Sequence, residues 1–129
     1  MLFRSWMAAK KEEAVIYQST IGKEWTNSEL MAKGESVYAI SCAGCHQAKG
    51  EGIPGVFPAL FDSPIVTGPV EDHIGILING VAGSAMQSFA DQLSEVDIAA
   101  VIHYKRNSWG NEMGDTVQPI DILNYKQTQ

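Results

Sequence analysis

The residues most able to do chemistry in this chain are two cysteines and a histidine, in the order Cys42, Cys45 and His46. Two thiols separated by two residues, with an imidazole directly after the second, form the C-x-x-C-H pattern that attaches a c-type haem. The thiols would add across the two vinyl groups of the porphyrin to form thioethers. The imidazole of His46 would then face the iron as its proximal ligand. The pattern therefore predicts one covalently attached haem c.

Other sites built on paired cysteines fit these residues less well. A structural zinc site takes four Cys or His ligands, usually in two spaced pairs. This chain has only two cysteines, and His73 and His103 do not form a second closely spaced pair. A thioredoxin-like C-x-x-C lies beside a βαβ pattern, and no alternating Val/Ile-rich strand flanks Cys42. A disulfide between Cys42 and Cys45 would leave His46 without a role.

Length and charge restrict the class of protein further. The chain has 129 residues, which suits one domain, and a formal net charge of −6. A chain with a pI near 4.9 is a poor partner for nucleic acid, whose phosphates repel it, and suits a basic protein partner instead. A haem would also add apolar surface to the small core.

The expected compartment follows from the chemistry of attachment. Covalent haem attachment takes place outside the cytoplasm in bacteria, so we expect the domain on the periplasmic or outer face of the cytoplasmic membrane. Residues 1–6 include Arg4 but no apolar run follows as in a signal peptide, and no run reaches the length of a membrane span. We therefore expect the chain to be part of a longer, membrane-anchored protein.

Two helices are predicted ahead of the motif. Apolar side chains recur at helical spacing in residues 1–18 before a charged stretch, which predicts a short amphipathic helix. These side chains are Leu2, Phe3, Trp6 and Met7. Polar residues 22–27 then suit a linker. Thr26 with Glu29 matches a capping box, which predicts a second helix running towards Cys42.

After the motif the pattern changes to loops. Residues 44–69 hold four of the five prolines and many glycines, which predicts a loop with one helical turn near Leu60. Pro69 suits the first residue of a helix that continues through Asn79. Residues 80–92 are again irregular.

A last principal helix closes the domain. Ser94 with Asp97 matches a capping-box pattern and predicts a helix to about Asn107. The polar tail from Gly110, interrupted by Pro119, is expected to be a loosely held extension.

These elements predict an all-α fold of three main helices, with long loops that wrap one haem. Long loops normally count against an assignment, but here they can pack on the cofactor. We expect an N-terminal helix and linker over residues 1–27, a haem domain over 28–109 and a C-terminal extension over 110–129.

A six-coordinate haem also needs a distal ligand, and methionine sulfur suits it. Four methionines beyond the first residue are candidates: Met7, Met31, Met86 and Met113. Met31 is too near the motif to reach the opposite haem face easily, and we expect Met7 and Met31 to fill the core. Met86 lies in a loop whose glycines let the backbone approach a flat ligand closely. His73 and His103 would give a bis-His haem, although solvated or half-buried helix histidines are the expected reading.

Four segments carry a resemblance to a known family. They are Gly34-x-x-x-Tyr38 ahead of Cys42, Phe57-Pro58-Ala59-Leu60, Ala82-Gly83-Ser84-Ala85-Met86 and Val101-x-x-Tyr104. Over roughly residues 28–109 the chain resembles a class I cytochrome c. The glycine and aromatic of the first segment resemble the place where the first and last helices of that family cross.

The resemblance also implies roles for individual residues. Pro58 would accept a hydrogen bond from the proximal histidine through its carbonyl, which fixes the orientation of the ring. Leu60 would contact the haem, and Met86 would be the distal iron ligand. Ala82 departs from the family, in which many members have proline, and this departure concerns the rigidity of the methionine loop.

A narrower resemblance rests on shorter pieces. The segment Tyr104-Lys105-Arg106-Asn107-Ser108-Trp109-Gly110-Asn111, with Thr67-Gly68-Pro69 and Ile78-Asn79-Gly80, resembles the haem c domain fused to subunit II of some cytochrome c oxidases. The opening Phe3-Arg4-Ser5-Trp6 resembles the helix that follows the copper domain there. This implies an upstream membrane anchor and dinuclear copper domain. The copper ligands themselves are absent from this chain.

The resemblance implies one-electron transfer through a His46/Met86-ligated haem, with no catalytic site in the domain. In the oxidase context a cytochrome c or quinol–cytochrome c reductase would donate, and the copper domain of the oxidase would accept. Residues 74–90 carry no formal charge and predict a neutral docking patch. One alternative is a free-standing periplasmic cytochrome c that serves a dehydrogenase or reductase. Another is a haem sensor or peroxidase with an open iron site.

Overall fold

The computed structural model describes residues 2–129, with the side chains of Leu2, Phe3, Arg4, Ile16 and Gln18 outside the description. The described chain forms helices and loops and no β-strand beyond an isolated bridge between Ile53 and Phe57. The helices are α1 (Leu2–Ser19), α2 (Asn27–Ser41), α3 (Ala43–His46), α4 (Val70–Asn79), α5 (Glu95–Arg106) and α6 (Pro119–Gln127). The all-α prediction is confirmed.

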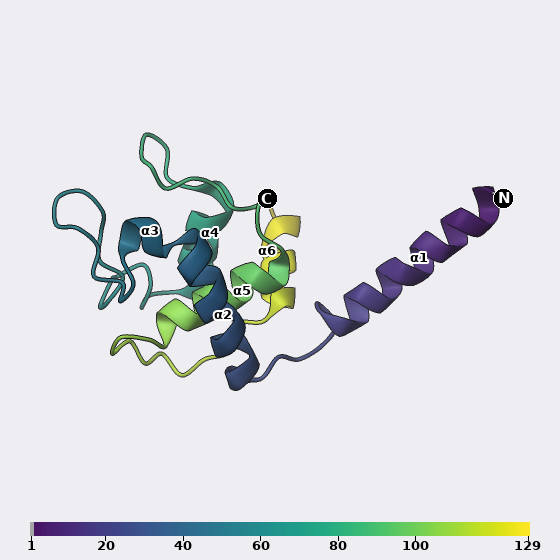
Figure 1. Ribbon diagram of the computed structural model, residues 1–129, viewed down its shortest axis with the longest axis horizontal. Coiled ribbons are helices and arrows are strands. Elements are labelled where there is room, and N and C mark those ends of the chain that lie inside the picture. The colour runs from purple at the N-terminus through teal and green to yellow at the C-terminus, as the bar shows by residue number, and fades with distance from the viewer. Residues whose placement is uncertain (1) are drawn as a thin grey trace.

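Helix α1 extends away from the other helices (Figure 1) and, over the described residues, contacts none of them. The predicted helix is therefore present, although its apolar face falls partly on Leu2 and Phe3, whose side chains lie outside the described residues. Met7 is 49% exposed, so the expectation that it fills the core is wrong. No helix among the described residues is both long and apolar enough to cross a membrane.

Helices α2 and α5 cross closely at the centre of the domain (Figure 1). A Cβ atom on Gly34 would lie 2.2 Å from the carbonyl oxygen of Ala100 and 2.6 Å from the Cβ of Tyr104. Only a residue without a side chain allows this approach. Beside the crossing, the rings of Tyr38, Tyr104 and Trp109 pack with centroids 5.0–5.6 Å apart. The close crossing that the family resemblance implied is thus present.

The predicted starts of α2 and α5 agree with the structure. Thr26 Oγ1 accepts a hydrogen bond from the Glu29 N–H at 3.2 Å, and Glu29 Oε1 accepts from the Thr26 N–H at 3.1 Å. Ser94 Oγ accepts from the Asp97 N–H at 3.1 Å and begins α5. Each bond satisfies an amide that the first helical turn leaves without an intrahelical partner.

Two local predictions differ from the structure. No helix forms at Leu60, whose N–H bonds to the Gly50 carbonyl at 2.7 Å. Isolated single turns lie on either side of it, closed by Phe57 N–H to Ile53 O and by Thr67 N–H to Ser63 O, each at 2.9 Å. Pro69 precedes α4 as its N-cap residue and is not its first helical residue. A one-residue shift of this kind changes nothing in the placement of the helix.

The segment after Gly110 is not loosely held, contrary to prediction. Pro119 begins α6, a position in which its missing N–H costs nothing. Ile122 is completely buried, and α6 packs on α5 and α4. Gln118 joins this segment to the linker before α2, since its side chain both accepts from the Trp25 N–H at 2.8 Å and donates to the Trp25 carbonyl at 2.9 Å.

Candidate haem site

The two cysteines lie on consecutive turns at the end of α2. Cys42 ends that helix, with its N–H bonded to the Tyr38 carbonyl at 2.9 Å. The single turn of α3 follows, and the His46 N–H bonds to the Cys42 carbonyl at 3.0 Å. Cys42 is buried, Cys45 is exposed, and neither is in a disulfide. One thiol therefore faces the core and the other the surface, with the imidazole one residue further on.

His46 is held in one orientation. Its Nδ1 lies 3.0 Å from the carbonyl oxygen of Pro58. A carbonyl can only accept, so Nδ1 carries the proton and Nε2 keeps its lone pair, as an iron ligand requires. Burial lowers the pKa of His46, while the bond to Pro58 raises it, so the ring is neutral near pH 7. This is the contact that the family resemblance implied for Pro58.

The loop that brings Pro58 to His46 closes through glycine. Gly52 has φ +63°, and a Cβ there would lie 2.5 Å from the Phe57 carbonyl oxygen. The Gly52 N–H bonds to the carbonyl of His46 at 2.9 Å. The loop after the motif thus folds back across the histidine, because glycine permits both the left-handed backbone and the close approach.

Met86 lies on a short loop fixed to the end of α4. The Val81 N–H bonds to the Met86 carbonyl at 2.9 Å, and the Met86 N–H bonds to Ser84 Oγ at 3.2 Å. The Met86 side chain is half-buried and packs on the core cluster that contains Cys42 and Leu60. Met113, at 38% exposed, lies outside that cluster. The structure therefore brings Cys42, Leu60 and Met86 to one core, and the iron ligation by Met86 stays a prediction.

Both helix histidines are more deeply buried than predicted, with exposures of 2% for His73 and 1% for His103. His103 is paired: its Nε2 lies 2.7 Å from Asn27 Oδ1. His73 lies on α4, and neither of its ring nitrogens has a hydrogen-bond partner. The expectation of solvated or half-buried rings fails because helical spacing alone does not show which face of α4 and α5 meets the core.

Two buried polar residues position the loops and were given no role by the sequence. Arg106 donates through Nη1 to the carbonyls of Val66 (3.1 Å) and Gly68 (2.7 Å), and through Nη2 to Asp115 at 2.6 Å. Asn111 donates to the Leu60 carbonyl at 3.0 Å. Both belong to the segment 104–111 on which the narrower resemblance was based, and that resemblance was the available sign that these residues matter.

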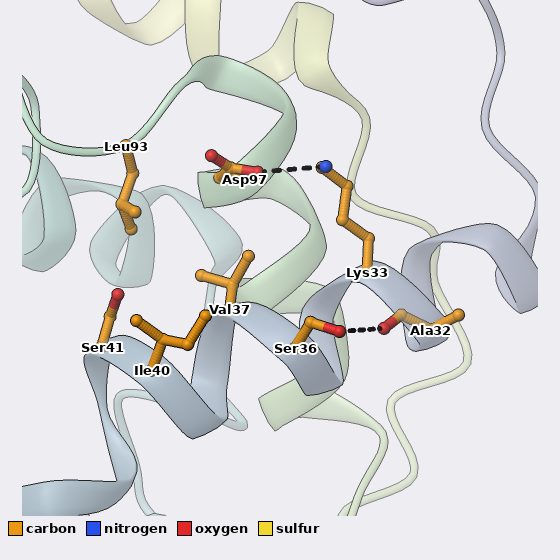
Figure 2. A pocket seen from close by; sticks show the side chains of 8 residues that line it. All are labelled: Ala32, Lys33, Ser36, Val37, Ile40, Ser41, Leu93 and Asp97. Atoms are coloured by element: carbon orange, nitrogen blue, oxygen red, sulfur yellow. Dashed lines mark hydrogen bonds and ion pairs between the residues drawn. The ribbon is translucent and has the colours of Figure 1, made fainter.

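A groove on the outer face of α2 lies beside the motif without including it. Figure 2 shows its lining, in which Lys33 forms an ion pair of 3.4 Å with Asp97 and Ile40 points outward. A second groove is lined by Glu51 and by residues 54–59. Neither groove contains Cys45, His46 or Met86, so neither is the haem site itself.

The donor set fits a haem c. The described residues include no group of three or more His, Cys, Asp or Glu side chains that could hold a bare metal ion. They do supply two unpaired thiols, one neutral imidazole with a free Nε2 and, in His73, a buried imidazole whose nitrogens lack partners. Thiols that add to vinyl groups, and an imidazole that binds iron, need these groups in these states.

Comparison with known proteins agrees with this chemistry. Residues 29–104 match the family described as cytochrome C oxidase, cbb3-type, subunit III. Cytochrome c-552 of Thermus thermophilus is 39% identical over 94 residues, which cover 62% of this chain and 70% of that protein.

Two similar proteins are subunits of dehydrogenases. The cytochrome c subunit of alcohol dehydrogenase (quinone) from Gluconobacter oxydans is 32% identical over 108 residues, covering 74% of this chain and 22% of that protein. The cytochrome c subunit of gluconate 2-dehydrogenase from Pantoea cypripedii is 30% identical over 107 residues, covering 74% of this chain and 24% of that protein. This chain spans less than a quarter of either subunit.

None of these three relatives is named as an oxidase subunit II, so the narrower resemblance finds no support among them. The broader resemblance to the cytochromes c is supported, because the matched residues 29–104 contain the C-x-x-C-H motif, the loop with Pro58 and Met86. The chain therefore belongs to the cytochromes c, within the family described as cytochrome C oxidase, cbb3-type, subunit III, and it binds one covalent haem c.

Proposed function

We propose that this domain carries single electrons between two redox partners through a haem c whose iron has His46 and Met86 as axial ligands. The observation that carries the proposal is the bond of His46 Nδ1 to the Pro58 carbonyl at 3.0 Å, which leaves Nε2 for the iron. Histidine and methionine together favour the ferrous form and give a raised potential. Ligands held in both oxidation states leave little to rearrange when an electron passes.

Electrons would enter and leave at the methionine loop. Residues 81–85 are all exposed, and residues 74–90 carry no formal charge. A neutral, partly apolar surface suits brief contact between redox proteins, whose interfaces are small. Acidic residues further out would steer a basic partner towards it.

A dehydrogenase or reductase is the partner class that the comparisons favour. Two of the similar proteins are named as cytochrome c subunits of an alcohol dehydrogenase and a gluconate dehydrogenase, and a third is a cytochrome c-552. We infer that this domain accepts electrons from such an enzyme in the periplasm, either as a diffusible carrier or as part of a larger subunit.

A terminal oxidase is the second candidate. The matched family is described by an oxidase subunit, and Arg106 and Asn111 of the oxidase-like segment tie the loops of the domain together. In that case a cytochrome c or quinol–cytochrome c reductase would donate, and an oxidase copper domain upstream would accept. The reading frame before Met1 distinguishes the two candidates, since the second requires copper ligands and a membrane anchor there.

Spectroscopy of the matured protein tests electron transfer against an open-site function. We expect one haem per chain that stays with the denatured polypeptide, a low-spin iron in both states and no carbon monoxide binding at neutral pH. Binding of carbon monoxide by the native ferrous protein would instead favour a sensor or peroxidase. A preparation without covalently bound iron porphyrin would contradict the whole proposal.

A further inference from the structure

The loop that carries the Pro58 carbonyl to His46 is held mainly at its two ends. Residues 53–59 lie outside the core cluster, whereas Leu60 belongs to it and Gly50 is buried. The two ends are joined to each other, since the Leu60 N–H bonds to the Gly50 carbonyl at 2.7 Å. The position of the Pro58 carbonyl therefore depends on what holds these ends.

Two residues that follow α5, Trp109 and Asn111, hold both ends. A Cβ atom on Gly50 would lie 2.5 Å from Cζ3 of Trp109, so the indole ring lies directly against that backbone. Asn111 is 4% exposed, and it donates to the Leu60 carbonyl at 3.0 Å and accepts from the Asp62 N–H at 2.8 Å. Its amide also donates to a carbonyl of α5 at 3.0 Å. Both ends of the loop are thus tied to the end of the last principal helix.

The ends act on the Pro58 carbonyl over short stretches of chain. Gly52 lies two residues after Gly50, and a Cβ atom on Gly52 would lie 2.7 Å from the carbonyl oxygen of Pro58. Leu60 lies two residues after Pro58. A shift of either end would therefore move this oxygen, whose bond to His46 Nδ1 is 3.0 Å long. Hydrogen bonds weaken steeply when their angle is lost.

The backbone around these contacts is strained. Three non-glycine residues of the described chain have left-handed φ angles, namely Gln47 at +69°, Asp62 at +56° and Trp109 at +57°. Gln47 directly follows His46, and its carbonyl accepts a hydrogen bond from the hydroxyl of Tyr38, whose ring packs 5.0 Å from that of Trp109. Such backbone is uncommon outside glycine and persists where the surrounding structure fixes it, often at functional sites.

We propose that Trp109 and Asn111 are positioning residues, which keep the Pro58 carbonyl on His46 and so set the potential of the iron from its proximal side. The inference rests on the proposed function, in which His46 binds the iron. A carbonyl that accepts from Nδ1 makes the imidazole a stronger electron donor, which favours the ferric iron. Trp109 and Asn111 lie beyond the matched residues 29–104, so the family match does not itself imply this role.

The test uses the matured holoprotein with Asn111→Leu, with Trp109→Leu and with the matched control Asn107→Leu. Asn107 is a neighbouring asparagine whose side chain bonds instead to the His103 carbonyl at 2.9 Å and to the Gly114 N–H at 3.0 Å. Each of the two positioning variants should favour the ferrous iron by about threefold, a rise of about 28 mV for a one-electron couple. Asn107→Leu should leave the potential nearly unchanged.

The sign of the change separates positioning from a loss of packing. A variant that only let water reach the haem would favour the ferric iron and lower the potential. NMR of the diamagnetic ferrous protein gives a second readout, because the Nδ1 proton of His46 should exchange with solvent several-fold faster in Asn111→Leu, where its bond to Pro58 opens more often. Trp109→Phe keeps an aromatic ring against Gly50 and should restore most of the original potential.

Three results would overturn the inference. A lowered or unchanged potential in both Asn111→Leu and Trp109→Leu would mean that these residues only support the packing of the loop. An equal rise in Asn107→Leu would mean that general loosening of the domain moves the potential. Fast exchange of the His46 Nδ1 proton in the unmodified protein would contradict the inference even if no variant matures. Failure of the proposed function is distinct, since the unmodified protein would then show no covalent haem or a high-spin iron.

Discussion

His46 can serve as an iron ligand because its other ring nitrogen is already engaged by the Pro58 carbonyl. A ligand ring without such a bond would rotate and exchange tautomers, and the iron–nitrogen bond would weaken. Met86, the proposed ligand on the opposite side of the iron, is positioned in another way. The backbone of Met86 is closed into its loop by Val81 and Ser84, while its side chain reaches the core.

Replacing Met86 tests the distal ligand directly. Met86→Ala should leave the haem attached, convert the iron to a five-coordinate or water-bound high-spin form, permit carbon monoxide binding and lower the midpoint potential. Visible spectra and redox titration measure these changes. Met113→Ala is the matched control, since Met113 is exposed and outside the core cluster. A methionine-ligated spectrum retained in Met86→Ala would mean that another methionine binds the iron.

The buried His103 makes stability depend on pH. Burial is the main cause that lowers its pKa below the ordinary value of about 6.5. The unfolded chain then binds a proton that the folded one resists, so the free energy of unfolding should fall as pH drops below about 6.5. Denaturant unfolding at pH 7.5 and pH 5.5 measures it. In His103→Gln, which does not titrate, this fall should be smaller; an equal fall would mean that other groups cause it.

At the scale of the elements, the crossing of α2 and α5 is the contact on which the domain depends. The backbones approach until a Cβ on Gly34 would meet the Ala100 carbonyl oxygen at 2.2 Å. Backbone atoms cannot move aside as the end of a flexible side chain can. The geometry of Cys42, at the end of α2, therefore depends on a glycine eight residues earlier.

Gly34→Ala should destabilise the protein by roughly 1–3 kcal/mol, because an added methyl group forces the two helices apart. Denaturant titration gives the change in the free energy of unfolding. Gly44→Ala is the control, since a Cβ there meets nothing within 4 Å, and it should change stability by less than about 0.5 kcal/mol. Equal stability of the two variants would mean that the crossing tolerates the methyl group by a small shift.

At the scale of the whole molecule, we expect the surface around the methionine loop to decide which partners can dock. The chain carries a net charge of −6, yet residues 74–90 are uncharged. The exposed residues 81–85 therefore form a neutral loop on a chain that is acidic as a whole. We expect contact at this loop to be largely apolar, while the net negative charge of the chain favours a basic partner.

Ala85→Glu should slow electron delivery several-fold, because the new carboxylate must lose its water on docking without gaining a partner. Stopped-flow mixing with a reduced redox partner measures the rate, and the slowing should persist at high salt, where steering is screened. Ala9→Glu adds the same charge at an exposed position on α1, which contacts no other helix over the described residues, and should have little effect. Equal rates in Ala85→Glu and the unmodified protein would place docking elsewhere.

Several features of this protein could be predicted from the sequence alone, because they depend on the chemistry of residues close together in the chain. The C-x-x-C-H motif predicts the cofactor because thioether formation and iron ligation need those residues at that spacing. The starts of α2 and α5 were predicted from Thr26 with Glu29 and Ser94 with Asp97, since a capping hydrogen bond involves only residues three apart. These features do not depend on the rest of the chain.

Which side chains and segments are buried was decided only by the tertiary structure. Pro119 in a polar tail suggested a break, but Ile122 is buried because α6 meets the apolar sides of α4 and α5. His73 and Lys105 lie within helices of mixed polarity, and their burial depends on elements far away in the sequence. Hydrogen bonds within one turn can be read from neighbouring residues, whereas burial is set by which surfaces meet, and that is a property of the whole fold.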